Sequence, residues 1–378
     1  METERERDRR EIRRRSWLGH LWHEWIVESR RPIAPAFAHP TPESWSNDDL
    51  TAAWIGHSTV LINFFGIKIL TDPVLFPRIG IRLPFLTVGP KRLTQPALTF
   101  AELPPIDLVL LSHAHFDHID RRTLKLFSDA TQVITAKRTR DLLRGTKFSG
   151  AIELGWKESV NLTPRSLEIE VSAFRPKHWG ARMQYDIHRG YNSYVISRNN
   201  RRIIYGSDTA MTDAFAKLND AAPYDLAIMG IGAYDPWIWA HSTPEQAVAM
   251  ANAAGARFIM PVHHQTFRLS IEPFREPIER FTCALVKTPE RIARPSAQPA
   301  RTIDISGPAS RPRDHEYSSP WRPLARRDAL AGTPAPREPR QTLEIGATAR
   351  PGASRARPDP PARQPRRIQD LASFPFDR

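Results

Sequence analysis

Four side chains that can bind a metal ion lie close together in the sequence: His113, His115, Asp117 and His118. They follow the apolar run 107–111, which is typical of a buried strand, and a strand end is where a rigid scaffold presents a catalytic loop. Imidazole and carboxylate groups are the ligands of zinc sites that keep a coordination position open. The motif therefore predicts a catalytic metal centre, and a pair of transition-metal ions is its natural occupant.

Three more candidate ligands lie downstream, and each follows a run that is typical of a strand: His178, Asp208 and His263. One loop cannot surround two cations, so ligands from several strand ends are what a two-metal site requires. Taken singly, each could be a hydrogen-bonded loop residue, which is the more common role of an isolated histidine. Taken together, they favour a binuclear site.

The elements that must position these ligands can be read from the spacing of apolar residues and turn signals. Expected strands are 59–65, 67–71, 107–112, 167–173, 191–197, 203–206, 226–231 and 258–262. Expected helices are 121–127, 139–144, 211–218, 244–254 and 272–285. Helix 244–254 is the best marked, because Thr243 can cap it, Pro244 fits its first turn and Gly255 can stop it. This order predicts stacked sheets flanked by helices.

The net charge of +13 is concentrated at the two ends of the 378-residue chain. Residues 1–31 contribute +2 and residues 287–378 contribute +8, so the charge is weak support for a nucleic-acid partner, and none is expected. We divide the chain into a basic and aromatic arm with a linker, 1–49, a catalytic domain, 50–286, and a tail, 287–378. The tail holds 16 of the 35 prolines and is expected to be disordered.

An arginine-rich start leads into an aromatic and apolar helical face formed by Trp17, Leu18, Leu21, Trp22, Trp25 and Ile26. Two interpretations remain open: the helix docks on its own domain or on the partner in a homodimer, or it lies in a membrane interface as a peripheral contact. The single Cys283 excludes an intrachain disulfide. No run is apolar enough for a membrane span or a secretion signal, which favours a cytoplasmic protein, either free or peripheral at the membrane.

From about Trp54 to Phe281 the sequence resembles the metallo-β-lactamase superfamily. Within it, the chain is similar to the zinc phospholipases D that hydrolyse N-acyl-phosphatidylethanolamine and to their bacterial relatives. Beyond the metal motif, the resemblance rests on 89–92 (GPKR), 102–107 (ELPPID), 177–179 (KHW), 231–236 (IGAYDP) and 241–247 (HSTPEQA). It implies an α/β fold, the αβ/βα sandwich of two mixed sheets flanked by helices, with the metals at one edge.

The resemblance also implies how two zinc ions are bound. One would be held by His113, His115 and His178, the other by Asp117, His118 and His263, and Asp208 would bridge them. This chain departs from the family in having Ser207 where glycine usually precedes the bridging aspartate, and in having His264, which competes with His263 as the ligand. Asp72 resembles the carboxylate that orients a ligand imidazole, with turn capping as its alternative, and His57 would support the site without binding metal directly.

The activity implied is hydrolysis of a phospholipid phosphodiester, with hydroxide attacking phosphorus. Asp117, Asp208 and His241 would be catalytic, and His241 precedes a helix whose N-terminus favours an anion. Lys177 and Arg182 could offset phosphate charge. The aromatic residues Tyr234, Trp237 and Trp239, with Ile238, would form an apolar wall for acyl chains, unless they pack in the core.

Three other functions remain open. A lactone or carboxyl-ester hydrolase of the same fold would use the same ligands but would need neither basic phosphate contacts nor an apolar wall. A metal-dependent nuclease would usually carry an additional nucleic-acid-binding insertion, for which the stretch between Asp208 and His263 leaves no room. A binding module without catalysis is disfavoured by the complete ligand set.

Overall fold

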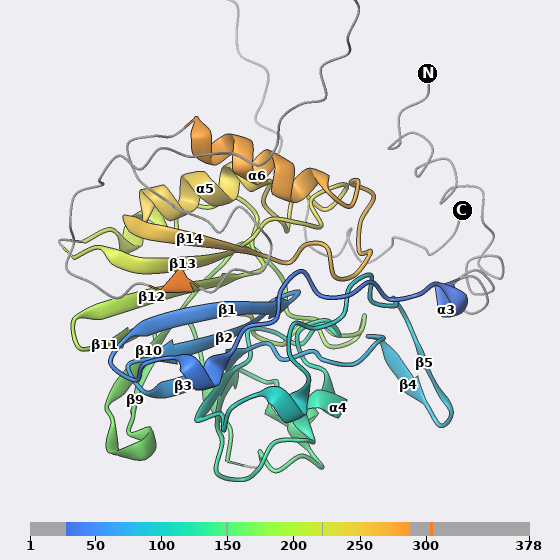
Figure 1. Cartoon of the computed structure of the whole chain (residues 1–378), viewed down its shortest axis with the longest axis horizontal. Coiled ribbons are helices and arrows are strands. Elements are labelled where there is room, and N and C mark those ends of the chain that lie inside the picture. The colour runs from blue at the N-terminus through green and yellow to red at the C-terminus, as the bar shows by residue number, and fades with distance from the viewer. Residues whose placement is uncertain (1–27, 149, 221, 288–302, 305–378) are drawn as a thin grey trace, which may run out of the picture. The chain divides into compact units, whose positions relative to one another are not determined.

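Two mixed β-sheets face each other across a shared core in the computed structural model, which describes residues 28–148, 150–220, 222–287 and 303–304 (Figure 1). The aromatic face 17–26 and the tail, apart from 287 and 303–304, lie outside the described residues. Residues 28–49 do not run free of the domain, because Ala34 forms a β-bridge with Thr94.

The first sheet contains seven strands and is antiparallel at one end and parallel at the other. In spatial order its strands are β15 (Ile303–Asp304), β1 (Leu50–Gly56), β2 (Thr59–Phe64), β3 (Ile67–Thr71), β6 (Leu108–Leu110), β7 (Gln132–Ala136) and β8 (Ile152–Leu154). The expected hairpin about Gly66 is confirmed as β2 and β3.

The second sheet contains six strands, of which β12, β13 and β14 run parallel. Its spatial order is β14 (Ala256–Val262), β13 (Tyr224–Gly230), β12 (Arg201–Ser207), β11 (Ser193–Arg198), β10 (Ile169–Phe174) and β9 (Ser159–Leu162). A separate hairpin consists of β4 (Ile81–Leu83) and β5 (Leu86–Val88).

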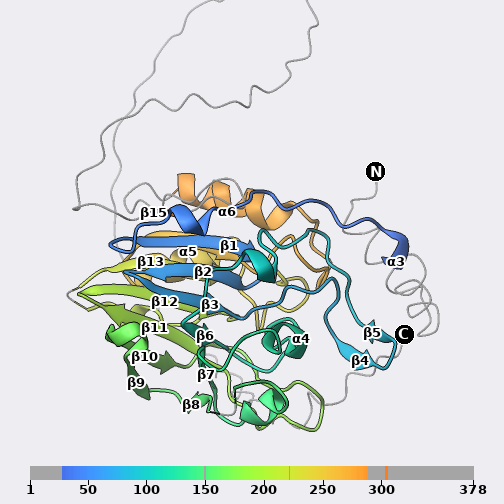
Figure 2. The ribbon, with the colours of Figure 1, turned by 60° about the horizontal axis from the view of Figure 1, so that its bottom comes forward.

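Apolar side chains from the inner faces of both sheets form the central core, where for example Ile62 and Phe64 share a cluster with Ile196 and Ile228. The outer faces are covered by helices and turns (Figures 1 and 2). The α-helices are α3 (Glu28–Arg30), α4 (Arg121–Leu124), α5 (Pro244–Ala253) and α6 (Glu276–Val286). The 3₁₀ turns are η2 (Pro42–Ser44), η3 (Phe100–Glu102), η4 (Arg140–Leu143), η5 (Pro164–Ser166) and η6 (Ala216–Leu218). The αβ/βα sandwich is thereby confirmed.

The start of α5 follows the sequence prediction closely. Thr243 Oγ1 accepts a hydrogen bond from the Gln246 amide at 3.3 Å, and the Gln246 side chain accepts one from the Thr243 amide at 3.1 Å. Gly255, with φ of 78°, follows the helix end. This cap fixes the chain direction directly after His241, which is a candidate catalytic residue.

Other helix predictions were wrong in length or type. The expected helix 121–127 has only one α-helical turn, α4, while 139–144 and 211–218 contain only the 3₁₀ turns η4 and η6. The expected helix 272–285 begins later, at Glu276. Short segments that pack one apolar face against a sheet do not need to complete a helix, so their periodicity overstates helix length. No described helix has the length and apolar character that crossing a membrane requires.

Candidate metal centre

The loop after β6 and the ends of β10 and β12 bring the first group of candidate ligands together. Atoms of His113, His115, His178 and Asp208 all lie within 4.8 Å of one another. His113 Nε2 lies 2.8 Å from His115 Nδ1, and His178 Nε2 lies 3.4 Å from the same atom. The His178 Nδ1 atom is 3.0 Å from the Ala240 carbonyl oxygen, a contact that assigns its N–H there and turns the Nε2 lone pair toward the cluster.

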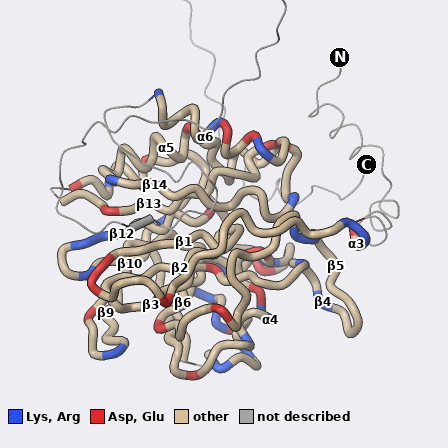
Figure 3. The backbone as a smooth tube through the Cα atoms, viewed as in Figure 1, with Lys and Arg blue, Asp and Glu red and all other residues tan. Residues whose placement is uncertain are grey.

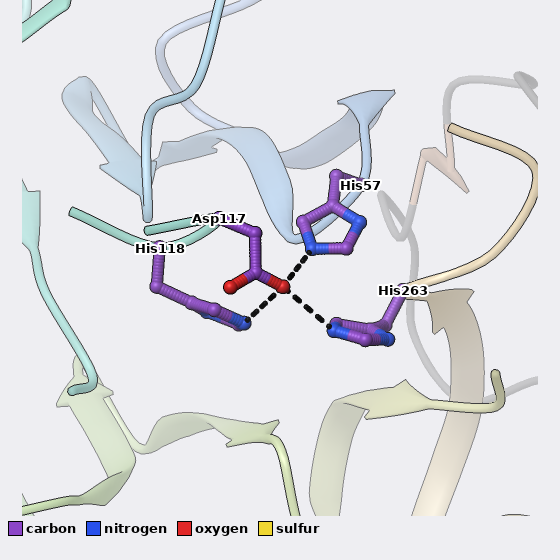
Figure 4. A group of neighbouring side chains, drawn as sticks. All are labelled: His57, Asp117, His118 and His263. Carbon is purple, nitrogen blue, oxygen red and sulfur yellow. Dashed lines mark hydrogen bonds and ion pairs between the residues drawn. The ribbon is translucent and has the colours of Figure 1, made fainter. Parts of the chain in front are cut away.

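The second group contains Asp117, His118 and His263, joined by His57, and its ligand atoms also lie within 4.8 Å of one another. Figure 4 shows the three imidazoles arranged around one carboxylate oxygen, Asp117 Oδ2. His57 Nε2 lies 2.9 Å from this oxygen, His263 Nε2 lies 3.3 Å away and His118 Nε2 lies 3.6 Å away. His57 therefore lies next to the candidate ligand Asp117, where it can support the site as expected from the sequence.

Asp208 connects the two groups. Its Oδ2 atom lies 3.1 Å from His118 Nε2, 3.2 Å from His263 Nε2 and 3.8 Å from both His113 Nε2 and His178 Nε2. The third candidate group adds His241, whose Nδ1 is 4.0 Å from the same oxygen. The shared position is the geometry that a bridging ligand needs.

Buried polar atoms without hydrogen-bond partners test whether this donor set suits metal ions. Among the described residues, these atoms include His118 Nε2, His263 Nε2 and Asp208 Oδ1. Leaving such atoms unpaired is costly, and the two imidazole nitrogens both face Asp208 Oδ2, at 3.1 and 3.2 Å. Imidazole nitrogens and carboxylate oxygens are zinc ligands, so the residues present fit the ions that the sequence predicts.

The electrostatics of the metal-free cluster follow from the same contacts. Burial acts to lower the pKa of His118, but Asp208, Asp117 and Asp72 raise it well above its usual value. For His263, burial is likewise outweighed by Asp208 and Asp117, and the pKa rises to about 9. Burial would raise the pKa of Asp208, yet His118 and His263 hold it well below its usual range. Without metal, the raised pKa values favour the protonated forms of His118 and His263, so metal binding there would release protons.

Asp72 lies directly behind His118 and is completely buried. Its Oδ2 lies 2.6 Å from His118 Nδ1 and accepts hydrogen bonds from the hydroxyls of Ser112 and Tyr205, both at 2.5 Å. Its Oδ1 accepts the Ser112 amide at 2.7 Å. A carboxylate that binds Nδ1–H leaves the Nε2 lone pair of His118 directed at the candidate metal position. Sequence reasoning identified Asp72 but missed Tyr205, because tyrosine in a strand gives no signal of a polar role.

Replacing Tyr205 with phenylalanine should weaken zinc binding about 10- to 100-fold, because Asp72 loses one of the donors that fix its position. Competition for zinc against a chromophoric chelator measures this change. Tyr194→Phe is the matched control: it removes an equally buried hydroxyl, on the paired position of β11, that donates to the Leu111 carbonyl. Unchanged zinc affinity in Tyr205→Phe would show that Asp72 needs no such support.

The backbone at the site is held in an unusual conformation. His57, Asp72, Ser207 and His263 all have positive φ angles, of 55°, 30°, 51° and 60°. Residues with side chains seldom adopt this region, and such strain clusters at functional sites. The φ angle of Ser207 also explains the family's usual glycine at this position, since glycine adopts it without strain.

His264 does not compete with its neighbour in this structure. Its ring stacks on Trp54, with centroids 4.5 Å apart, and it belongs to none of the ligand groups found among the described residues. His263 occupies the cluster instead. The adjacent rings point in different directions because β14 ends here and the chain turns.

The two basic candidates are placed differently from each other. Arg182 Nη1 donates to the carbonyls of Ala114 and Ile119 at 2.8 and 3.0 Å, and its guanidinium lies 3.9 Å from the centroid of the Phe116 ring. Arg182 therefore holds the metal loop in position through its backbone carbonyls. This positioning role was not predicted from the sequence. Lys177 is exposed, and its amide donates to Thr209 Oγ1 at 3.0 Å.

Aromatic side chains continue outward from the cluster as a ledge formed by Trp179, Trp237 and Trp239. Trp179 contacts the His115 ring edge-to-face at 4.5 Å and stacks on Trp239 at 4.9 Å. Trp237, Ile238 and Trp239 are 42%, 47% and 53% exposed. Tyr234 is not part of this ledge: it is buried, and its hydroxyl donates to Glu276 on α6 at 2.8 Å.

Comparisons with known proteins agree with the fold and indicate the family. The model of the β-lactamase superfamily domain matches residues 68–264. The chain is 32% identical to an uncharacterised protein of Mycobacterium tuberculosis over 311 residues, covering 80% of each chain. It is 30% identical to N-acyl-phosphatidylethanolamine-hydrolysing phospholipase D 1 of Caenorhabditis elegans over 250 residues, which covers 62% of this chain and 69% of the relative. An isothiocyanate hydrolase from Delia radicum gut bacteria shares the fold, with a TM-score of 0.51 at 15% identity, over 67% of this chain and 98% of the other.

Proposed function

This chain belongs to the metallo-β-lactamase superfamily and is a metal-dependent hydrolase, and from that premise we propose that it cleaves a phosphodiester bond in a phospholipid. The observation that carries this proposal is the aromatic ledge, which begins on a candidate ligand, His115, and ends on the half-exposed Trp239. An apolar surface leading to a polar reaction centre suits an amphiphilic substrate.

We propose that two zinc ions occupy the centre, one held by His113, His115 and His178 and the other by Asp117, His118 and His263, with Asp208 shared. When bound, such ions lower the pKa of a water molecule to about 7 and polarise a phosphoryl oxygen. The remaining steps depend on the protein's own side chains.

Asp117 is suited to steering the attacking water. Burial would raise the pKa of Asp117, but His118, His263 and His57 hold it well below its usual value, so the carboxylate stays ionised. The His57 N–H fixes one of its oxygens at 2.9 Å. An ionised, oriented carboxylate can align a water molecule by accepting its hydrogen bond.

His241 faces the centre from the side of α5. Burial is the main reason that its pKa falls to about 3, so the ring is neutral and offers one donor and one acceptor. With Nδ1 4.0 Å from Asp208, His241 is placed to hydrogen-bond a substrate phosphate or the leaving oxygen.

The similarity to the Caenorhabditis elegans phospholipase D supports a lipid substrate of the same class, an N-acyl-phosphatidylethanolamine. A lactone or carboxyl-ester hydrolase is the second candidate, and one observation favours it. Arg182 uses its Nη1 donors on loop carbonyls, which leaves fewer of its N–H groups free to bind a phosphate than the sequence suggested.

A substrate panel separates the two functions. Bis-p-nitrophenyl phosphate, a lactone series and N-acyl-phosphatidylethanolamine are offered to the zinc-loaded protein, and products are identified by mass spectrometry. We expect turnover of both phosphodiesters, with phosphatidic acid released from the lipid. In Trp239→Ala, kcat/KM should fall about tenfold for the lipid, because apolar contact is lost, and should stay unchanged for the soluble diester.

Leu126→Ala serves as the control, because it removes an apolar side chain of similar exposure, 45%, two residues after the end of α4. Lactone turnover without diester turnover would reject the phosphodiesterase proposal.

A further inference from the structure

The hairpin of β4 and β5 stands apart from both main sheets. Its strands pair only with each other, through Ile81 with Val88, Arg82 with Thr87 and Leu83 with Leu86. Figures 1 and 2 show it projecting from the sandwich in both views. A two-stranded hairpin is marginally stable in water, so a projecting one needs either support at its base or a partner at its tip.

The tip of this hairpin is apolar and exposed. Ile81 and Leu83 are 46% and 44% exposed, and Phe85, in the turn, is 98% exposed. Single exposed apolar residues are common on protein surfaces, but three large ones gathered on one projecting element mark an interaction surface. The tip therefore indicates a binding partner with an apolar surface or interior.

The base of the hairpin is held by close backbone packing and hydrogen bonds. These contacts keep the tip exposed. Gly80 and Gly89 face each other with φ of 119° and 142°, and a side chain on either would collide with backbone of the opposite strand. Arg78 Nη1 donates to the Gly89 carbonyl at 2.8 Å. Arg122 of α4 donates to Thr87 Oγ1 at 3.0 Å and to the Arg78 carbonyl.

Within the hairpin segment itself, the charged side chains all have one sign. Residues 78–91 contain Arg78, Arg82 and Lys91 and no acidic residue. Arg82 lies between two of the exposed apolar side chains, and Figure 3 shows no acidic position along the hairpin. An apolar tip with a cationic base complements the anionic surface and apolar interior of a phospholipid bilayer.

The hairpin is also coupled to the metal centre through the chain. Arg122, which binds the hairpin at Thr87, belongs to α4, and α4 begins three residues after the candidate ligand His118. If the hairpin tip is bound to a surface, α4 and the metal loop that precedes it are therefore held near that surface.

We propose that residues 81–86 insert into the interface of a bilayer that contains anionic phospholipid, and that this contact presents the metal centre to its substrate. The second part rests on the proposed function, whereas insertion itself is independent of catalysis. Vesicle binding is measured without turnover, so a failure of docking and a failure of phospholipid hydrolysis give different results.

A label at the tip tests insertion directly. Cys283, the only cysteine, is exposed, so Cys283→Ser gives a background for the single labelling site Phe85→Cys with an environment-sensitive fluorophore. On vesicles of equal parts phosphatidylcholine and phosphatidylglycerol, the emission should shift to the blue, and nitroxide-bearing lipids should quench it. The same label at Val286→Cys, on the 77% exposed end of α6, should show neither effect. An unchanged spectrum at position 85 would overturn the proposal.

Substitution tests the energetic importance of the tip. Phe85→Ser should weaken vesicle binding by about 10- to 100-fold in co-sedimentation, as expected from losing burial of one aromatic side chain. Arg82→Gln should weaken binding most at low salt. Both variants should hydrolyse the soluble diester at the unaltered rate, and Val286→Ser should bind vesicles normally. Unchanged vesicle binding in Phe85→Ser, or a change from dimer to monomer in light scattering instead, would show that the tip has a different occupant.

Discussion

Replacing Asp208 with alanine should reduce turnover at least about 1000-fold and release at least one equivalent of metal. The reason is geometric, because Asp208 Oδ2 is the atom that lies within 4.0 Å of nitrogens from both ligand groups and of His241. Metal content by plasma mass spectrometry and turnover of bis-p-nitrophenyl phosphate measure the two effects.

Asp213→Ala is the control for this variant. It removes an exposed aspartate five positions away, whose partner is Lys217 on the surface, and it should leave both quantities unchanged. An Asp208→Ala protein that kept two metal equivalents and full turnover would reject the shared-ligand assignment.

The metal-free protein should unfold in mild acid, whereas the zinc-loaded protein should withstand it. Burial is the main cause that lowers the pKa of these six histidines: His57, His113, His115, His178, His241 and His264. The pKa falls to about 3 for His57, His178 and His241, and to about 4 for His115 and His264. In the unfolded chain each would titrate near its ordinary pKa of about 6.5.

The sign follows from proton uptake. As pH falls below about 6.5, the unfolded chain binds protons on these histidines that the folded chain excludes, so the folded state loses stability. At pH 5 each of the five histidines with a stated pKa would account for about 2 kcal/mol, and these five together for on the order of 10 kcal/mol, which is comparable to the whole stability of a domain. His263, with its pKa raised to about 9, acts in the opposite range: its contribution is complete below pH 6.5 and is lost as pH rises toward 9.

Circular dichroism at stepwise lower pH measures the acid unfolding midpoint of the metal-free protein, prepared with a chelator, and of the zinc-loaded protein. His264→Phe keeps an aromatic ring on Trp54 but removes one titrating group, so its acid midpoint without metal should move to lower pH. His188→Ala, at an exposed histidine, should not move it. A metal-free protein that stays folded at about pH 4 would contradict the argument.

The sequence predicted the sandwich and the residues that the structure gathers at its edge because both leave local signals. Apolar runs mark strands, and a histidine or aspartate that follows one is placed at a sheet edge by the strand itself. His178, Asp208 and His263 are found beside the 113–118 loop for this reason. Their roles as metal ligands remain predictions, which the Asp208 variant tests first.

Features that depend on contacts between distant segments could not be read in the same way. Tyr205 binds Asp72 across 133 residues of sequence, and Arg182 reaches the metal loop from the loop after β10. The strand β1 was missed because it contains Ala52 and Ala53, and alanine has a low strand propensity. The hairpin of β4 and β5 was missed because its apolar residues face outward, against the pattern on which strand prediction depends.

The short strand β15 changes how the C-terminal segment should be regarded. Ile303 and Asp304 pair with Ala52 and Thr51 and so cover the outer border of the first sheet. An uncovered border presents free N–H and C=O groups that can recruit the sheet of another molecule, and proteins avoid self-association by shielding it. A chain shortened to residue 286 would lose this shield, whereas one shortened to residue 306 would retain it. We therefore expect truncation at residue 286 to lower the solubility of the protein more than its catalytic activity.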